Sequence, residues 1–344
     1  MALVYMKPRL EIHFSFTQLF RFVFGKSYKA EGTEYLLNNS RCGIFLAIKS
    51  LCLPPDSSVG VMVYNCHSVM NAVEQAGCKL LFLDVTDEMK LDEEDLNKKA
   101  SKISVLIVTH LFGIVNDVER IRAAHPHLVI IEDCAHAYGL EELYGDFATF
   151  SIGQGKLPSI GDGGILKVLN PKYRQKVDSL YFDLPDYTKI QSAKLLLKLM
   201  ACSIMQSSLV YGWLTLPIKR KLNIPKNIER IVPMKMCKGI GSIFEEERTS
   251  ISRAIAGRKR NAQRLMSDTP EGVIKVTMGQ NAFMLVLHCN NPAAVKDYYQ
   301  QRGVETATHF ANSIRWAEQF GYLPKQCPNA ENLVNKLLMV PVYL

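Results

Sequence analysis

The feature that most constrains this chain is a series of short apolar segments that alternate with helical patterns from about residue 34. Four segments have the length and composition of buried strands, namely Ser58–Tyr64, Lys79–Val85, Val105–Thr109 and Leu128–Glu132. Helical patterns lie between them at 43–53, 69–77 and 115–124. Strands that are apolar on both faces and separated by helices are typical of a mainly parallel sheet covered on both sides. The sequence therefore predicts an α/β fold that binds its ligand at the carboxyl ends of the strands.

The pattern changes after about residue 170. Residues 187–221 are apolar and helical in character, and 238–268 form a long charged helical pattern. Two strand-like runs, 273–276 and 283–287, precede a further helix. We therefore expect three parts. These are an aromatic N-terminal segment at 1–33, a large domain at 34–235 with an apolar helical insertion at about 187–221, and a long helix with a small C-terminal α+β domain at 236–344.

Cysteine usage and charge exclude several classes of protein. The nine cysteines are scattered without a CxxC pair, which argues against a disulfide framework and against a structural zinc site. We expect a reducing, cytoplasmic location and no metal, and the N-terminus lacks a signal-peptide pattern. The net charge of +8 is spread along the chain without an aromatic-basic signature, so we expect no nucleic-acid partner.

The segment Ile130–Gly139 reads IIEDCAHAYG and places Asp133 at the end of a buried strand. A buried carboxylate needs a cationic partner or several hydrogen-bond donors. One interpretation is a helix N-cap or an internal salt bridge. The other is a carboxylate that faces the protonated nitrogen of a heterocyclic cofactor.

The segment 145–164 is rich in glycine, lies between apolar runs and contains Lys156. Lysine is the side chain that forms Schiff bases, and glycines allow the backbone to approach a ligand closely. Read alone, a lysine in such a loop is usually a solvated side chain.

The segment 38–43 reads NNSRCG and directly precedes a helical pattern. Small polar residues and an arginine at a helix N-terminus form an anion site, although a plain Ser or Asn cap explains them too. Together, an anion cradle, a strand-end aspartate and a later loop lysine suit pyridoxal phosphate (PLP) on a parallel α/β scaffold.

These motifs resemble the DegT/StrS-type sugar aminotransferases, PLP enzymes with the aspartate-aminotransferase fold (fold type I). Glu132–Gly139 is similar to the family's Glu-Asp-Ala-Ala-Gln/His-Ala-x-Gly motif, and His110–Gly113 to its His-Leu-Tyr-Gly segment. Ser151, Lys156 and Gly161–Gly164 keep its spacing from serine to lysine to a Gly-acid-Gly-Gly signature. The resemblance runs from about residue 35 to 170 and resumes from about 234.

The resemblance implies a role for each matching residue. Lys156 is then the Schiff-base lysine, Asp133 the partner of the pyridine nitrogen, and His136 a contact to the cofactor's phenolic oxygen or ring face. Residues of the phosphate loop and the strand end then hold the cofactor and its phosphate, namely Asn39, Ser40, Arg41 and Ser151. The resemblance also implies a homodimer with active sites at the interface.

Several positions depart from the family's pattern. Ser40 and Arg41 replace a Gly and a Thr of the phosphate loop. The aromatic residue that covers the cofactor ring falls at Cys66 or His67, where His67 is either a stacking residue or a structural histidine. Lys235 keeps one cation of a segment that reaches the partner subunit's phosphate, and His309 matches a histidine near the substrate.

The resulting expectation is an aminotransferase that moves nitrogen from an amino acid, glutamate by resemblance, to a keto-sugar nucleotide. One alternative is a lipid-linked or other apolar carbonyl substrate at the cytoplasmic face of a membrane. A non-catalytic binding or partner subunit is the alternative from another class. For 187–221 one interpretation is a buried helix or a dimer contact. The other is a membrane-surface helix or a substrate lid, because lysines at 194 and 198 precede its most apolar part and basic residues at 219–221 follow it.

Overall fold

The computed structural model describes residues 6–10, 14–221 and 230–343. A seven-stranded sheet forms its centre, in the order β1-β7-β6-β5-β4-β2-β3. The strands are β1 (Glu34–Leu37), β2 (Ser58–Met62), β3 (Lys79–Leu83), β4 (Val105–Thr109), β5 (Val129–Asp133), β6 (Phe147–Ser151) and β7 (Gly164–Val168). The pairs from β3 through β6 are parallel, and β7 and β1 add an antiparallel edge. The predicted mainly parallel sheet is confirmed.

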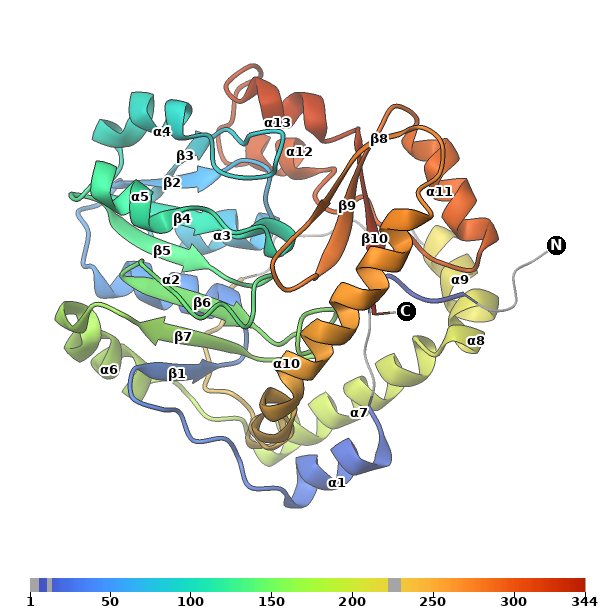
Figure 1. Cartoon of the computed structure of the whole chain (residues 1–344). Helices are drawn as coiled ribbons and strands as arrows, with labels where there is room; N and C mark the ends of the chain where they lie inside the picture. Colours follow the sequence, from blue (N-terminus) through green and yellow to red (C-terminus); the bar gives the residue numbers. More distant parts are fainter. Residues whose placement is uncertain (1–5, 11–13, 222–229, 344) are drawn as a thin grey trace.

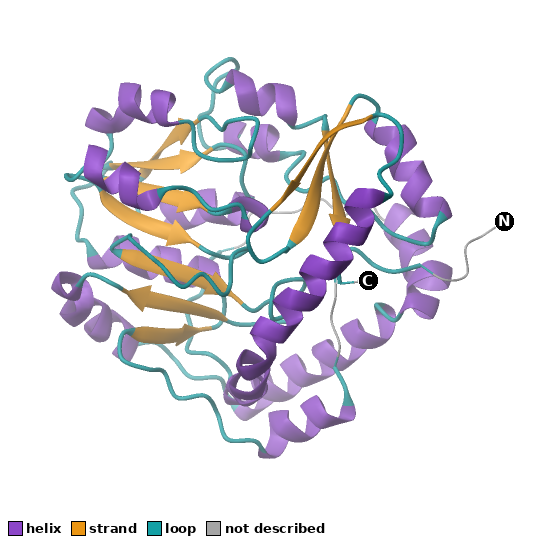
Figure 2. Cartoon of the chain, viewed as in Figure 1, coloured by secondary structure: helices purple, strands orange, loops and turns teal. Residues whose placement is uncertain are grey.

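Both faces of the sheet are covered (Figures 1 and 2). Along β4, Val105 and Ile107 enter one core cluster, whereas Leu106 and Val108 enter another. This alternation explains why the central strands read as unbroken apolar runs in the sequence. The helices that contribute to these clusters include α2 (Ser40–Ser50), α3 (His67–Gln75), α4 (Glu93–Lys99), α5 (Val118–Ala124) and α6 (Arg174–Phe182).

A second, three-stranded antiparallel sheet lies in the C-terminal part, in the order β10-β9-β8. Its strands are β8 (Val273–Met278), β9 (Met284–Cys289) and β10 (Leu337–Pro341). The helices of this part are α11 (Pro292–Gln301), α12 (Ser313–Glu318) and α13 (Pro328–Leu333). The predicted long helix is α10 (Lys238–Ser267), and its Ala262 packs with the apolar face of this small sheet. The predicted class, an α/β fold with a small α+β part at the C-terminus, is therefore confirmed.

The aromatic N-terminal segment contains α1 (Phe16–Phe24), which begins with a capping box between Ser15 and Gln18. The predicted apolar insertion is not one helix. It consists of α7 (Lys189–Met205), α8 (Ser208–Val210), a π-turn at Tyr211–Thr215 and α9 (Leu216–Lys221). Side chains at 219–221, whose charge supported the membrane interpretation, lie outside the described residues.

In the described part of the chain no single helix is long and apolar enough to cross a bilayer. The pair Lys189–Met205 and Ser208–Ile218 reaches that length and composition only together, with a bend of 67° between its two legs.

Candidate active site

Three polar residues end three neighbouring strands. Thr109 is the last residue of β4, Asp133 of β5 and Ser151 of β6. Thr109 stands opposite Asp133 in the parallel register. Because the carboxyl ends of parallel strands meet at one edge of the sheet, these residues come to one place. That edge opens into a cavity of about 640 Å³.

Asp133 lies buried at the base of this cavity. Its Oδ1 accepts a hydrogen bond from the Ala135 N–H at 3.1 Å, and Thr109 Oγ1 donates to its Oδ2 at 3.3 Å. Burial raises the pKa of Asp133, while the Ala135 N–H and the nearby Lys156 and His110 oppose that shift. The net shift is upward, so the carboxylate stands in a site that favours an additional cationic partner.

The N-terminus of α2 forms another wall. The Asn39 side chain caps the helix by accepting from the Cys42 N–H at 3.1 Å, and Ser40 and Arg41 are the first residues of the helix. Ser40 Oγ is buried and has no hydrogen-bond partner among the described residues. Helix N-termini bind anions through free N–H groups and the helix dipole. A donor without a partner beside an arginine at such a terminus is what a phosphate requires.

Gly164, the last residue of the Gly161–Gly164 signature, lies where a side chain would overlap neighbouring backbone. A Cβ at position 164 would lie 2.3 Å from Asn39 C and from Ser40 N. The preceding Gly163 has a φ of +109° and donates its N–H to Asn38 O at 3.0 Å. The signature therefore brings the start of β7 into direct backbone contact with Asn38–Ser40, a contact that a side chain would prevent.

Lys156 projects into the cavity from the loop between β6 and β7. Its backbone N–H donates to Gly153 O at 3.1 Å, and Gly155 is held by Ser159 Oγ at 2.9 Å. Lys156 Nζ lies 5.8 Å from the centre of the Phe283 ring. The same amine is close enough to Asp133 and His136 to influence the pKa of both.

His136 is a buried, neutral histidine. Burial lowers its pKa well below the usual range, and the charges of Lys156 and His309 act in the same direction. Its Nδ1 accepts from the Phe112 N–H at 3.2 Å, which leaves the proton on Nε2. The ring stacks on Phe283, with 4.4 Å between centroids and 15° between planes.

The cavity thus brings together nine of the ten residues predicted from the sequence. They are Asn39, Ser40, Arg41, His67, Asp133, His136, Ser151, Lys156 and His309. Segments that are far apart in the chain, the α2 N-terminus, the β5 end and the β6–β7 loop, therefore surround one space.

Comparison with known proteins supports the motif assignment. Residues 29–184 match the DegT/DnrJ/EryC1/StrS aminotransferase family. The resemblance predicted from the motifs is confirmed over this part of the chain.

Curated relatives match part of this chain. GDP-perosamine synthase of Escherichia coli O157:H7 is 29% identical over 146 residues, which cover 40% of this chain and 40% of the relative. The dTDP-3-amino-3,4,6-trideoxy-alpha-D-glucose transaminase of Micromonospora megalomicea subsp. nigra is 28% identical over 163 residues, or 41% of this chain and 44% of the relative. The matches thus span about two-fifths of the length of these curated relatives.

The fold similarity extends over nearly the whole chain. The putative sugar aminotransferase Spr1654 of Streptococcus pneumoniae superposes with a TM-score of 0.73 and 14% identity, covering 99% of this chain and 93% of that one. At this identity the likeness establishes a shared fold. It extends beyond the matched family segment into the C-terminal part.

Lys235, the tenth predicted residue, is not among the residues that line this cavity. Its Nζ donates to Phe182 O at 3.2 Å and lies 5.6 Å from the centre of the Tyr181 ring. Its role toward a partner subunit's phosphate therefore stays a prediction.

The cavity also contains residues that the sequence analysis did not select. Lys198 of α7 and Asp162 of the glycine signature line its wall beside Arg41. Burial raises the pKa of Asp162, whereas the Gly163 N–H and the charge of Lys198 oppose that shift. Lys198 was visible in the sequence as a cation inside an apolar helix, but its direction depends on how α7 packs.

Cys66 and His67, where the resemblance places the family's aromatic residue over the cofactor ring, both line the cavity. Cys66 Sγ lies 3.7 Å from His67 Nδ1 and accepts a hydrogen bond from Ser68 Oγ at 3.1 Å. Burial by itself raises the pKa of Cys66, but the hydrogen bonds and charge of His67, with Ser68, reverse this effect and lower the pKa to about 6. The His67 ring lies tilted, 5.1 Å from the ring of Trp316.

This geometry predicts a reactive thiol in the cavity. We expect the rate of Cys66 alkylation by iodoacetamide to rise with pH around a midpoint near 6, because only the thiolate attacks. Peptide mapping by mass spectrometry at each pH measures it. In His67→Gln the midpoint should move upward, since the main partner of the thiolate is lost. An unchanged midpoint in that variant would contradict the assignment.

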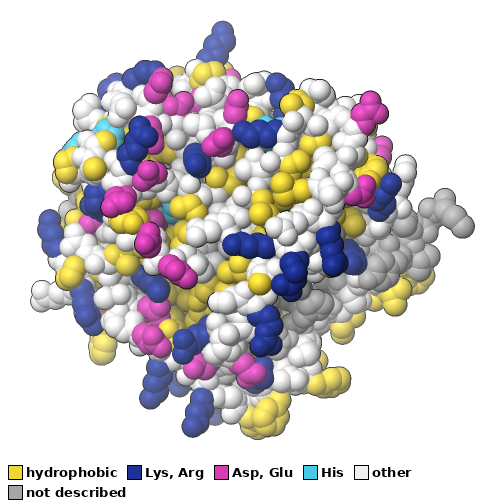
Figure 3. Space-filling model, viewed as in Figure 1, with side chains coloured by type: hydrophobic (Ala, Val, Ile, Leu, Met, Phe, Trp, Pro, Cys, Tyr) yellow, Lys and Arg dark blue, Asp and Glu magenta, His cyan; other side chains and the backbone are white. Residues whose placement is uncertain are grey.

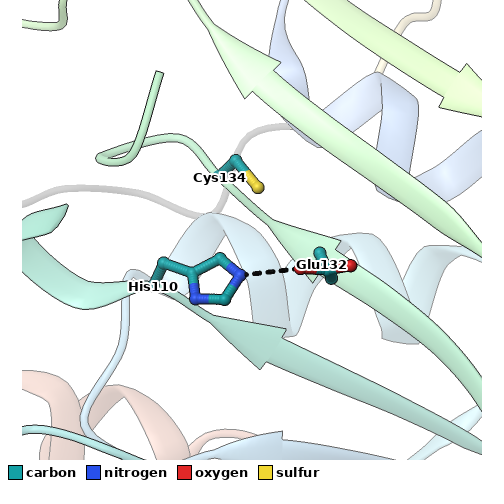
Figure 4. A group of neighbouring side chains, drawn as sticks. All are labelled: His110, Glu132 and Cys134. Carbon is teal, nitrogen blue, oxygen red and sulfur yellow. Dashed lines mark hydrogen bonds and ion pairs between the residues drawn. The ribbon is translucent and has the colours of Figure 1, made fainter. Parts of the chain in front are cut away.

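A buried polar cluster lies next to Asp133 and is shown in Figure 4. His110, Glu132 and Cys134 place potential ligand atoms within 4.8 Å of one another. However, His110 Nε2 pairs with Glu132 Oε2 at 3.0 Å, His110 Nδ1 accepts from the Asn116 N–H, and Glu132 Oε1 accepts from the Tyr144 and Gly145 N–H groups. Hydrogen bonds within the protein thus account for these histidine and carboxylate atoms, and the cluster supports the loop after β5.

Proposed function

We propose that this chain is a PLP-dependent aminotransferase. It would take an amino group from an amino acid, glutamate by resemblance, and transfer it to the carbonyl of a keto-sugar nucleotide. One observation carries the proposal. A single cavity holds a loop lysine, a buried strand-end carboxylate and a helix N-terminus with an unpartnered serine hydroxyl and an arginine.

The residues present fit the cofactor at both of its ends. Ser40, Arg41 and Ser151 would bind the phosphate, with Asn39 holding the helix terminus in place. Asp133 would pair with the protonated ring nitrogen, which supplies the positive charge that its buried position favours. His136, stacked on Phe283 and carrying its proton on Nε2, would donate that hydrogen toward the ring substituents.

Pyridoxal phosphate, when bound, supplies the electron sink and the carbonyl that accepts the donor's nitrogen. The chain's own contribution to the chemistry is Lys156. Its Nζ amine would bind the cofactor aldehyde covalently and, once displaced by the donor, would hold and move the transferred proton as a general base. Phe283 lies beside that amine, with 5.8 Å from Nζ to the ring centre, and His136 stacks on the same ring.

The names of the relatives support the proposed acceptor. One is a GDP-perosamine synthase and another a dTDP-amino-sugar transaminase, so both names refer to sugars carried on nucleotides. Each match covers less than half of the relative. The amino donor, the acceptor and a homodimer with active sites at its interface are therefore proposed for this chain.

A lipid-linked carbonyl is the second candidate acceptor, and the position of α7 favours it. Lys198 on this helix lines the cavity, while Leu197 and Met200 beside it are exposed. The cavity mouth therefore lies next to apolar surface, where an acceptor with a lipid tail would place its head group.

The reaction predicts a two-step spectroscopic result. We expect the PLP-loaded protein to lose its violet absorbance when L-glutamate is added and to regain it with a suitable keto compound. Keto-sugar nucleotides and lipid-linked keto sugars in micelles are the two acceptor panels, and recovery with only one of them selects between the candidates. A protein that binds PLP but responds to no amino donor would instead support the non-catalytic alternative.

A further inference from the structure

Exposed large apolar side chains gather on two elements that the proposed chemistry does not use. One element is α1, and the other is the bent pair from α7 to α9. We call their exposed side chains the outer apolar surface. It consists of Phe16, Phe20, Val23, Phe24, Ile190, Leu197, Met200, Ile204, Met205, Leu209, Trp213, Leu214 and Ile218.

Helix α1 presents its apolar face to solvent. Phe16, Phe20 and Phe24 follow a four-residue spacing and are 91%, 64% and 71% exposed. A surface helix of a water-soluble protein normally turns such a face toward the core. Here the opposite side, through Phe22, packs against the interior instead.

Both elements expose their apolar faces on the same side of the molecule. Phe22 of α1 and Leu195 and Leu199 of α7 pack into one core cluster, so the outer sides of the two helices point away from a common interior. The Phe14 N–H also donates to Ser203 Oγ at 3.0 Å. In Figure 1 the two helices follow the lower edge, and Figure 3 shows hydrophobic side chains protruding there.

The bent pair is held flat against the protein. Leu195 and Leu199 anchor its first leg, and the buried Tyr211 anchors the second by donating to Glu305 Oε2 at 2.7 Å. Thr215 Oγ1 donates to Met205 O at 2.7 Å and so joins the two legs across the bend. An element anchored at both legs lies along a surface more readily than it crosses a bilayer.

Charge decides which partner suits this surface. Residues 187–218 contain Lys189, Lys194 and Lys198 and no acidic residue, and residues 14–30 contain Arg21, Lys26 and Lys29 and no acidic residue. Arg21 pairs with Glu246 of α10. Apolar side chains bordered by cations are complementary to anionic lipid headgroups above an acyl interior. In a symmetric contact with a second copy the same cations would repel one another.

We propose that the outer apolar surface binds an anionic lipid bilayer, with α1 and the bent pair lying in the interface. The aromatic rings and aliphatic side chains enter the headgroup boundary, and the surrounding lysines contact lipid phosphates. Because Lys198 lines the cavity from α7, the cavity mouth then opens beside the membrane.

Vesicle binding tests this proposal on the full chain. We expect cosedimentation with vesicles of phosphatidylcholine and phosphatidylglycerol at low salt, and several-fold weaker binding at high salt or to phosphatidylcholine alone. The variant Phe20→Ser/Leu197→Ser/Trp213→Ser should bind at least about tenfold more weakly, since it removes apolar area from the interface.

The matched control removes exposed apolar side chains elsewhere. Ile274 and Leu323 are each 63% exposed, close to the 66% of Leu197, so Ile274→Ser/Leu323→Ser should bind vesicles like the unchanged chain. Trp213 is 73% exposed, and its fluorescence should shift to the blue on vesicles. PLP absorbance on the same samples shows that each variant keeps its fold and its cofactor site.

Three outcomes would overturn the proposal. The first is equal vesicle binding by Phe20→Ser/Leu197→Ser/Trp213→Ser and by the control Ile274→Ser/Leu323→Ser. The second is no binding to anionic vesicles at any salt concentration. The third is a dimer in sedimentation that the triple variant loses while vesicle binding is absent, which would show that the surface is an interface between copies of this chain.

Discussion

We expect Lys156→Ala to abolish covalent PLP attachment and to lower the transamination rate by at least about 10⁴-fold, because in the proposed function Lys156 is both the cofactor anchor and the general base. Asp133 and the α2 N-terminus remain in place, so the variant should still bind the cofactor noncovalently. Borohydride reduction followed by peptide mass spectrometry measures attachment at residue 156, and the glutamate half-reaction measures rate.

Two comparisons make this result specific. Lys198→Ala removes another lysine of the same cavity and should leave covalent attachment at Lys156 intact. Circular dichroism of Lys156→Ala should match that of the unchanged chain, since the loop is held by backbone contacts and by Ser159. If Lys156→Ala still forms a reducible PLP adduct at a residue of this cavity, the proposed role of Lys156 is refuted.

We expect Gly164→Ala to destabilise the protein by about 3 kcal/mol and to weaken PLP binding, because the new methyl group would overlap the backbone of Asn39 and Ser40 at the proposed phosphate site. A Cβ there would lie 2.3 Å from Asn39 C and Ser40 N, and backbone atoms at the start of a helix have little freedom to move away. Urea unfolding measures the stability, and absorbance titration measures cofactor affinity.

Gly257→Ala is the matched control for that substitution. It lies in α10, where the nearest atom to a new Cβ is 3.9 Å away. Alanine also has the higher helix propensity, so we expect stability to be unchanged or to rise by up to about 1 kcal/mol. Equal urea midpoints for the two variants would mean that the β7–α2 contact tolerates a side chain.

Much of the sheet was predictable from the sequence because its central strands are apolar on both faces. The pattern at 105–109 coincides with β4, and the predicted strand at 128–132 differs from β5 by one residue. That single residue matters, because it makes Asp133 the last residue of the strand. Strand β10 was not predicted, since its apolar run at 337–341 becomes a strand only by pairing with β9 across the small sheet.

The 187–221 segment shows the limit of pattern analysis most clearly. Its composition predicts helix, and helices form there, but the chain bends by 67° between Met205 and Ser208. The bend depends on the tertiary anchors Tyr211 and Thr215. From the sequence, 1–33 is likewise predicted only as an aromatic N-terminal segment, and the structure shows that Phe16 and Phe20 of its helix α1 are exposed.

The sequence by itself determined the α/β class and the chemical types at the site. Apolar strands require cover on both faces, and the residue types at Asn39–Arg41, Asp133 and Lys156 predict an anion cradle, a buried carboxylate and a Schiff-base amine. Only the tertiary structure decided that these segments share one cavity, that Lys198 joins them from α7, and that the apolar faces of α1 and α7 point outward. Those facts depend on which surfaces pack together, and packing is set by contacts between residues distant in the chain.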